Sequence, residues 1–253
     1  MLMRFYFGLI LVLLWPSVSF AQVQIVKAGQ PQGRIIIDEA VSTDSLAAVV
    51  LQRFIGEMSG AKLGVHDFQH IAAIRRNDIL IGDFQLDNWE SPPAIIDSLV
   101  ADGFLIDTRE GYLRLLSGGG KGSVYGVVTI LDDYLGMDYY AKDTYTLPEQ
   151  ADINLPELLL KDHPAFTYRQ TFSYGLEDPM YKLWFRLEAP GEAFAGNLWV
   201  HTFDRLLPSA QFGESHPEYY SLIKGKRQPG KASQWCLTNT EVLERVTEQL
   251  DSI

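Results

Sequence analysis

The sequence contains little cysteine and little basic charge, and each shortage excludes a class of protein. A single cysteine in 253 residues excludes a disulfide framework and a thiolate-rich metal site. The 32 aspartates and glutamates outnumber the 21 lysines and arginines, and the net charge of −11 argues against a nucleic-acid partner, which needs clustered basic side chains. Hydrophobic residues make up 47% of the chain, which excludes long-range disorder.

The only long apolar run lies at the N-terminus. Arg4 precedes a run of about a dozen mostly apolar residues, and Ser19 and Ala21 occupy the −3 and −1 positions of a signal-peptidase site. A membrane anchor is the alternative, but spanning a bilayer needs roughly 20 apolar residues, and this run is shorter. We therefore predict that residues 1–21 are a signal peptide. The mature chain is then exported, periplasmic or extracellular, with no membrane span after cleavage.

Strand and helix signals alternate in the first half of the chain. Short apolar segments typical of strands occur at residues 23–27, 34–37, 78–82, 103–108 and 112–117. A helix capped by Thr43 or Asp44 ends at Ser59-Gly60, a short helix begins at Pro92-Pro93, and a third runs from Gly122 to Leu135. The apolar stripe of the first helix consists of Leu46, Val49, Val50, Phe54 and Met58. This alternation predicts a small α/β domain over residues 22–145, a mixed sheet with helices.

The glycine run at residues 118–122 resembles a phosphate loop only superficially. The Walker pattern requires Ser or Thr after Gly-Lys, whereas Lys121 is followed by Gly122. The dinucleotide pattern also fails, because position 123 is Ser. We therefore interpret the run as a tight strand-to-helix turn and predict no cofactor.

The chain changes character after about residue 138. Pro148, Pro156 and Pro164 punctuate an extended stretch, so residues 146–163 are interpreted as a linker. Strand-like segments follow at residues 166–169, 197–201 and 234–237. Thr238 and Glu241 then form a capping box for a final helix.

Catalytic motifs are incomplete in this sequence. We find no pair of carboxylates at matching strand ends, as glycoside hydrolysis requires, and no Gly-x-Ser-x-Gly nucleophile motif. His66 and His70 lack the glutamate that follows the first histidine of a zincin. We therefore predict no catalytic residue and no metal ligand.

A binding site is better supported. His201 ends an apolar segment, and strand ends carry functional side chains in α/β barrels, although a structural hydrogen bond is an equal alternative. Aromatic residues are concentrated from Phe166 to Trp235. Such rings suit the apolar faces of sugars, and Arg169, His201 and Asn239 can supply directional hydrogen bonds, whereas core packing is the alternative for any single ring.

Two sets of short motifs resemble known families. The first set is Leu51-Gln52-Arg53-Phe54-Ile55, Met58-Ser59-Gly60-Ala61, Ile79-Leu80-Ile81-Gly82, Asp102-Gly103-Phe104 and Gly122-Ser123-Val124-Tyr125-Gly126-Val127. It is similar to the N-terminal accessory domain of family 67 α-glucuronidases and family 20 β-hexosaminidases. The second set is Pro164-Ala165-Phe166, Val200-His201-Thr202-Phe203, His216-Pro217-Glu218-Tyr219-Tyr220, Gly225-Lys226-Arg227 and Cys236-Leu237-Thr238-Asn239. It resembles the bacterial family called domain of unknown function 4838.

The resemblance implies an accessory α/β domain followed by an incomplete (β/α)8 barrel over residues 164–253. A barrel needs about 250 residues, whereas about 90 follow residue 163. The acid and base of the related enzymes lie on later strands, so the chain is expected to be truncated and inactive by itself. Arg169, His201 and Asn239 would line a sugar subsite at the ends of the first three barrel strands.

The expected function is that of an exported glycoside hydrolase-like protein of carbohydrate degradation, with carbohydrate as its partner. The alternative is a non-catalytic carbohydrate-binding or cell-envelope scaffold protein. A third possibility is that the chain does not fold beyond about residue 160, because an uncovered half-barrel would expose an edge strand. The oligomeric state is left open.

Overall fold

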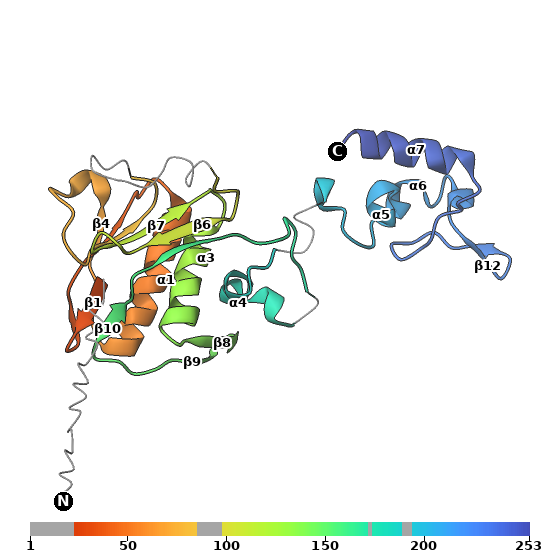
Figure 1. The fold of residues 1–253 in the computed structure, drawn as a ribbon. Coiled ribbons are helices and arrows are strands. Elements are labelled where there is room, and N and C mark those ends of the chain that lie inside the picture. Colours follow the sequence, from red (N-terminus) through yellow and green to blue (C-terminus); the bar gives the residue numbers. More distant parts are fainter. Residues whose placement is uncertain (1–22, 85–97, 172–173, 189–193) are drawn as a thin grey trace, which may run out of the picture. The chain divides into compact units, whose positions relative to one another are not determined.

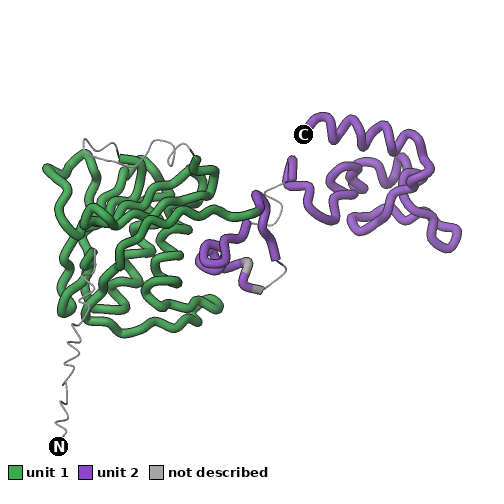
Figure 2. The backbone as a smooth tube through the Cα atoms, in the orientation of Figure 1, with its two compact units in different colours: residues 1–165 green, residues 166–253 purple. Residues whose placement is uncertain are grey.

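The structure, a computed structural model, describes residues 23–84, 98–171, 174–188 and 194–253. The predicted signal peptide and the predicted helix at Pro92-Pro93 lie outside the described residues. The chain divides into a first unit, residues 1–165, and a second unit, residues 166–253 (Figure 2).

A six-stranded mixed sheet organises the first unit. Its strands lie in the order β11 (Leu159–Asp162), β6 (Phe104–Asp107), β7 (Leu113–Ser117), β5 (Ile79–Ile81), β3 (Ile35–Ile37) and β4 (Val65–Asp67). Strands β7, β5, β3 and β4 are parallel, and β6 and β11 run antiparallel to their neighbours. The central strands are buried along their length, as their unbroken apolar runs require. The predicted mixed sheet is confirmed.

Two helices pack together against this sheet. Helix α1 (Ser42–Ser59) lies beside α3 (Gly122–Thr129), which continues through the π-helical turn η2 (Ile130–Tyr134) (Figure 1). Gly60 and Gly136 end the two helices in left-handed conformations, as predicted. The predicted stripe of α1 is partly wrong, because Leu46 and Val49 are exposed and Ala47, Ala48, Leu51 and Ile55 are buried instead. Small Ala47 and Ala48 allow the close approach of neighbouring elements.

The start of α1 also differs from the prediction. The helix is preceded by Val41, which provides no side-chain cap, and neither Thr43 nor Asp44 is the capping residue. The Asp44 side chain is instead 4% exposed and accepts a hydrogen bond from the Ser123 hydroxyl on α3. Burial raises the pKa of the Asp44 carboxyl, opposed in part by that hydrogen bond. The carboxyl therefore joins the two helices rather than capping one.

We predict that Asp44→Asn makes the unit less sensitive to pH. A raised pKa means that the folded chain holds this proton more tightly than the unfolded chain does. The associated stability is present below the unfolded pKa and is lost as the pH rises through the folded pKa. Urea unfolding between about pH 4 and pH 8 should show a smaller decline in the free energy of unfolding for Asp44→Asn than for the parent. An equal decline in both proteins would contradict the assignment.

The glycine run is a tight turn, as predicted. A Cβ atom on Gly118 would lie 2.1 Å from the Val100 carbonyl oxygen, and one on Gly122 would lie 2.2 Å from that of Gly103. The backbone N–H of Lys121 donates to Asp102 Oδ1 at 2.8 Å. A protein carboxylate thus bonds at the start of α3, where a phosphate would lie in a phosphate loop.

We predict that Gly122→Ala destabilises the chain by about 1–3 kcal/mol, because its Cβ would overlap backbone that cannot easily move. Gly230→Ala is the matched control, since a Cβ there meets nothing within 4 Å. Thermal unfolding of both variants checks the prediction. Equal stability of the two variants would show that the turn relaxes freely.

Two smaller sheets complete the first unit. Strand β1 (Val23–Lys27) lies between β10 (Ile153–Leu155) and β2 (Gln30–Pro31), and β8 (Asp138–Ala141) pairs with β9 (Thr144–Thr146). Residues 146–163, interpreted from the sequence as a linker, contain β10 and β11, which pair with β1 and β6. This stretch therefore extends two sheets of the first unit.

Helices, one pair of two-residue strands and loops make up the described part of the second unit. Its elements are η3 (Tyr174–Glu177), α4 (Pro179–Trp184), η4 (Ala195–Asn197), α5 (Phe203–Leu206), α6 (Ser209–Phe212), η5 (Pro217–Tyr219), β12 (Leu222–Ile223), β13 (Lys226–Arg227) and α7 (Thr240–Asp251). Its core consists of Leu206, Leu207, Tyr219, Tyr220, Val242 and Val246. No helix in the described ranges is long and apolar enough to cross a membrane.

The predicted first units of a barrel are not confirmed. In the described part of the second unit, strand pairing is limited to β12–β13 and a single bridge between Tyr220 and Trp235. The predicted strands at residues 166–169, 197–201 and 234–237 are wrong. Residues 197–201 cannot extend as a strand, because Asn197 (φ 55°) and His201 (φ 53°) adopt left-handed conformations at its two ends.

Candidate functional site

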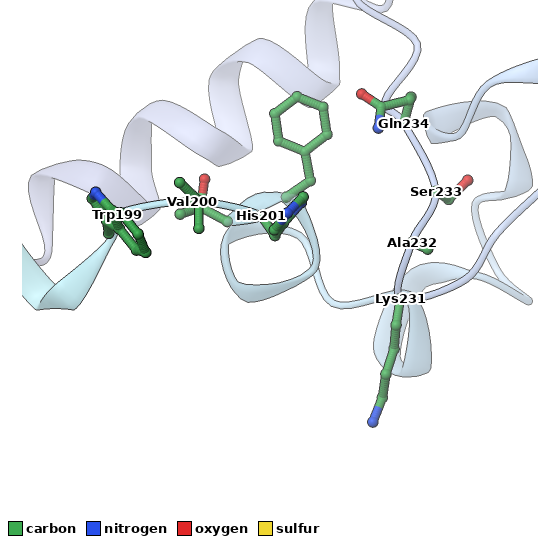
Figure 3. A pocket seen from close by; sticks show the side chains of 9 residues that line it. Trp199, Val200, His201, Lys231, Ala232, Ser233 and Gln234 are labelled. Carbon is green, nitrogen blue, oxygen red and sulfur yellow. The ribbon is translucent and has the colours of Figure 1, made fainter. Parts of the chain in front are cut away.

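A pocket of about 320 Å³ in the second unit contains the predicted residue His201 (Figure 3). Its lining consists of Trp199, Val200, His201, Thr202, Phe203, Lys231, Ala232, Ser233 and Gln234. Two segments thus form the pocket, one leading into α5 and one preceding the bridge at Trp235. The Lys231 side chain extends away from the other labelled residues (Figure 3).

Hydrogen bonds to backbone carbonyl oxygens fix the shape of the first segment. The guanidinium of Arg205, the third residue of α5, donates to the carbonyl oxygens of Gly196 and Asn197. The N–H groups of Arg205 and Leu206 bond back to the Thr202 carbonyl. These bonds close the chain around Trp199 and His201, so both residues lie on the pocket wall.

An aromatic stack includes Phe203 of the pocket lining. The rings of Phe203 and Trp235 lie 4.1 Å apart between centroids, at an interplanar angle of 15°. Trp235 forms an isolated antiparallel bridge with Tyr220. Next to this bridge, the Cys236 N–H donates to the Tyr219 carbonyl oxygen at 2.7 Å. Tyr219 and Tyr220 are fully buried in the core. The position of Phe203 is therefore fixed through the core.

The pocket offers binding groups but no acid–base pair. None of the nine described residues that line it is Asp or Glu. Asp204, next in the chain, accepts a hydrogen bond from the Ser209 N–H at 2.8 Å at the start of α6 (Ser209–Phe212). Hydrogen bonding to Ser209 lowers the pKa of Asp204, opposite to what a general acid needs. The arrangement can hold a ligand, and hydrolysis would need carboxylates beyond these residues.

Arg169 lies in a different setting. Its guanidinium forms an ion pair with Glu188 at 2.6 Å, and both side chains are 13% exposed. It also donates to the carbonyl oxygens of Phe166 and Arg186, while the Glu188 N–H donates to the Arg169 carbonyl at 2.7 Å. These bonds hold residues 166–169 against residues 186–188 without a strand pair. Arg169 does not line the His201 pocket.

Asn239 is the N-cap of α7. Its Oδ1 accepts hydrogen bonds from the N–H groups of Glu241 and Val242 at 3.0 and 3.4 Å. The capping box predicted at Thr238 is therefore wrong by one residue, and Glu241 pairs with Arg245 at 3.1 Å instead. Asn239 fits the role better, because its side chain reaches two free N–H groups. It lines a second pocket of about 120 Å³ rather than the one at His201.

The structure thus places the three predicted site residues apart, with only His201 in the larger pocket. Sequence reasoning did not single out Ser233 and Gln234, although the Pro229-Gly230 turn before them was a signal for a surface loop. No cluster of three or more His, Cys, Asp or Glu side chains among the described residues could hold a metal ion.

Comparisons with known proteins match part of the chain. Residues 139–253 match a family model described as a domain of unknown function, DUF4838. A solved structure described as a family GH115 4-O-methyl-α-glucuronidase, BtGH115A, with specificity for decorated arabinogalactans, is 14% identical with a TM-score of 0.42. That alignment covers 58% of this chain and 19% of the other. Curated proteins gave no match. The resemblance to domain 4838 is thus confirmed over residues 139–253, and the relation to β-hexosaminidases stays a prediction.

We predict that Arg169→Gln lowers the free energy of unfolding by about 3 kcal/mol, because it removes the cationic partner of the largely buried carboxylate of Glu188. The double variant Arg169→Gln, Glu188→Gln should recover part of the loss, since the buried carboxylate charge is then removed as well. Urea unfolding of the single and double variants checks this. A change within about 0.5 kcal/mol for Arg169→Gln would contradict a structural role for the pair.

Proposed function

We propose that this chain is an exported glycoside hydrolase-like protein of carbohydrate degradation and that the His201 pocket binds a sugar unit. The observation that carries the proposal is the composition of the pocket. Trp199 and Phe203 provide aromatic groups, and His201, Ser233 and Gln234 provide hydrogen-bonding groups. A sugar presents apolar C–H faces and a rim of hydroxyls, so it needs this combination.

The size of the pocket agrees with a small ligand. Ligand pockets hold roughly 300–1,000 Å³, and about 320 Å³ lies at the lower end of that range. A pocket of this volume would hold one unit of a longer glycan. The stack of Phe203 on Trp235 limits reorganisation on binding, because the ring is already positioned.

The role that we assign to this pocket is binding, not bond cleavage. Hydrolysis of a glycosidic bond uses two carboxyl groups on opposite sides of that bond. The described lining supplies none, and Asp204 is held in its ionised form by Ser209. We propose that the chain alone lacks the acid and base, in keeping with the family resemblance.

The three predicted residues receive different roles in this proposal. His201 contacts the ligand, because it lies on the pocket wall. Arg169 and Asn239 have supporting roles, since their polar groups already bond to Glu188 and to the start of α7. We propose export separately, because residues 1–21 have the pattern of a signal peptide.

A second candidate function is that of a non-catalytic carbohydrate-binding or cell-envelope scaffold protein. The absence of carboxylates among the described lining residues favours it. Both candidates predict glycan binding. They differ in whether a longer protein that carries this chain releases reducing sugar from the glycan that binds.

We predict that Trp199→Ala and His201→Asn each weaken glycan binding by about tenfold, or 1.4 kcal/mol. Asparagine is chosen at His201 because it tolerates the left-handed backbone there. Binding to a panel of plant and host polysaccharide fragments is measured by calorimetry. Tyr140→Ala is the control, because Tyr140 is an exposed aromatic residue of the first unit. Unchanged binding by both pocket variants, with folding intact by circular dichroism, would refute the proposed site.

A further inference from the structure

Helix α7 carries more apolar surface than the core covers. Val242 and Val246 are buried in the core of the second unit. Leu243 and Leu250 are 68% and 49% exposed, and Leu237, just before the helix, is 81% exposed. At about 100° per residue, Leu243 and Leu250 form a stripe directly beside Val246. Exposed leucines so grouped mark an interaction surface more often than scattered ones do.

A small apolar pocket lies at one end of this stripe. Its volume is about 120 Å³, and its lining consists of Trp235, Leu237, Asn239, Val242, Leu243 and Val246. The Trp235 Nε1 atom is buried and has no hydrogen-bond partner among the described residues. An unpaired buried N–H is costly, so a rearrangement on binding that gives this indole an acceptor oxygen would be favoured. The mostly apolar lining and the small volume of the pocket suit one apolar side chain of a partner.

The charge around the stripe selects the kind of partner. Helix α7 contains four acidic residues and one basic residue, Arg245, which pairs with Glu241. Glu244 and Asp251 are exposed, and by helical spacing they border Leu243 and Leu250. A second copy of this chain would place acidic residues against acidic residues. A basic segment instead gains from the pairing.

We propose that the surface formed by Leu237, Leu243 and Leu250 binds a basic amphipathic helix of a partner protein. One apolar side chain of that helix fills the pocket at Trp235, and its lysines or arginines face Glu244 and Asp251. Helices bind grooves in this way through apolar residues spaced three or four apart. This surface is separate from the lining of the His201 pocket, so the proposal does not depend on sugar binding.

The test uses a fluorescent synthetic helix of about 18 leucine and lysine residues, with leucines at helical spacing. A peptide of the same composition with scrambled spacing controls for attraction to the acidic chain. Fluorescence anisotropy measures binding to the full chain. We expect Leu243→Gln with Leu250→Gln, and separately Glu244→Lys with Asp251→Lys, to weaken binding of the spaced peptide at least tenfold. Leu222→Gln, an equally exposed leucine on β12, should leave it unchanged.

Three results would overturn the proposal. The first is equal binding of the spaced and scrambled peptides. The second is unchanged binding by the Leu243 and Leu250 variant, whose fold is verified by circular dichroism. The third is a dimer of the parent, seen by sedimentation, that this variant abolishes, because a second copy would then cover the surface. A downfield shift of the Trp235 indole N–H resonance on binding of the spaced peptide would support the proposal.

Discussion

Arginine side chains hold the backbone of the second unit where a sheet would otherwise do so. Arg205 donates to the carbonyls of Gly196 and Asn197, and Arg227 donates to that of Tyr220 at 2.8 Å. A guanidinium offers five donors in one plane, so one arginine side chain can bridge two backbone carbonyls. Loops can therefore be fixed in place without strand ladders. The positions of the pocket walls follow from these bonds.

The candidate site depends on this arrangement at both walls. The Arg205 bonds close the segment that carries Trp199 and His201. On the other side, Tyr220 pairs with Trp235, which stacks on Phe203. A rigid aromatic group is thus presented beside adaptable polar side chains, which is the composition that recognition of a sugar ring requires.

The first unit could be predicted closely from its sequence because its signals are local. Apolar runs mark β3 and β5, and Gly60 and Gly136 stop the helices. Asp44 was misassigned, since its bond to Ser123 joins residues far apart in the chain. The backbone of Gly122 lies so close to that of Gly103 that a side chain would not fit, which explains why glycine occurs there. The tight turn could be predicted from the glycine run.

The second unit could not be predicted in the same way. Residues 197–201 have the composition of a strand, and the left-handed backbone at Asn197 and His201 leaves no clear mark in the sequence. His201 was predicted at the end of a strand; it lies instead in a loop, where it lines the pocket. The ion pair of Arg169 with Glu188 depends on a fold that local patterns do not encode. The sequence therefore indicated one polar residue of the candidate pocket, but it did not show which polar groups are already bonded within the protein.

The most direct test of the account is a nuclear magnetic resonance titration of the ¹⁵N-labelled chain with the glycan fragment that binds most tightly. The account predicts saturable shifts of the Trp199 indole N–H and of the His201 and Ser233 amides, which line the pocket. The indole N–H of Trp184, a residue that is 6% exposed on α4, should stay unchanged. Shifts confined to the first unit, or none at the pocket, would contradict the account.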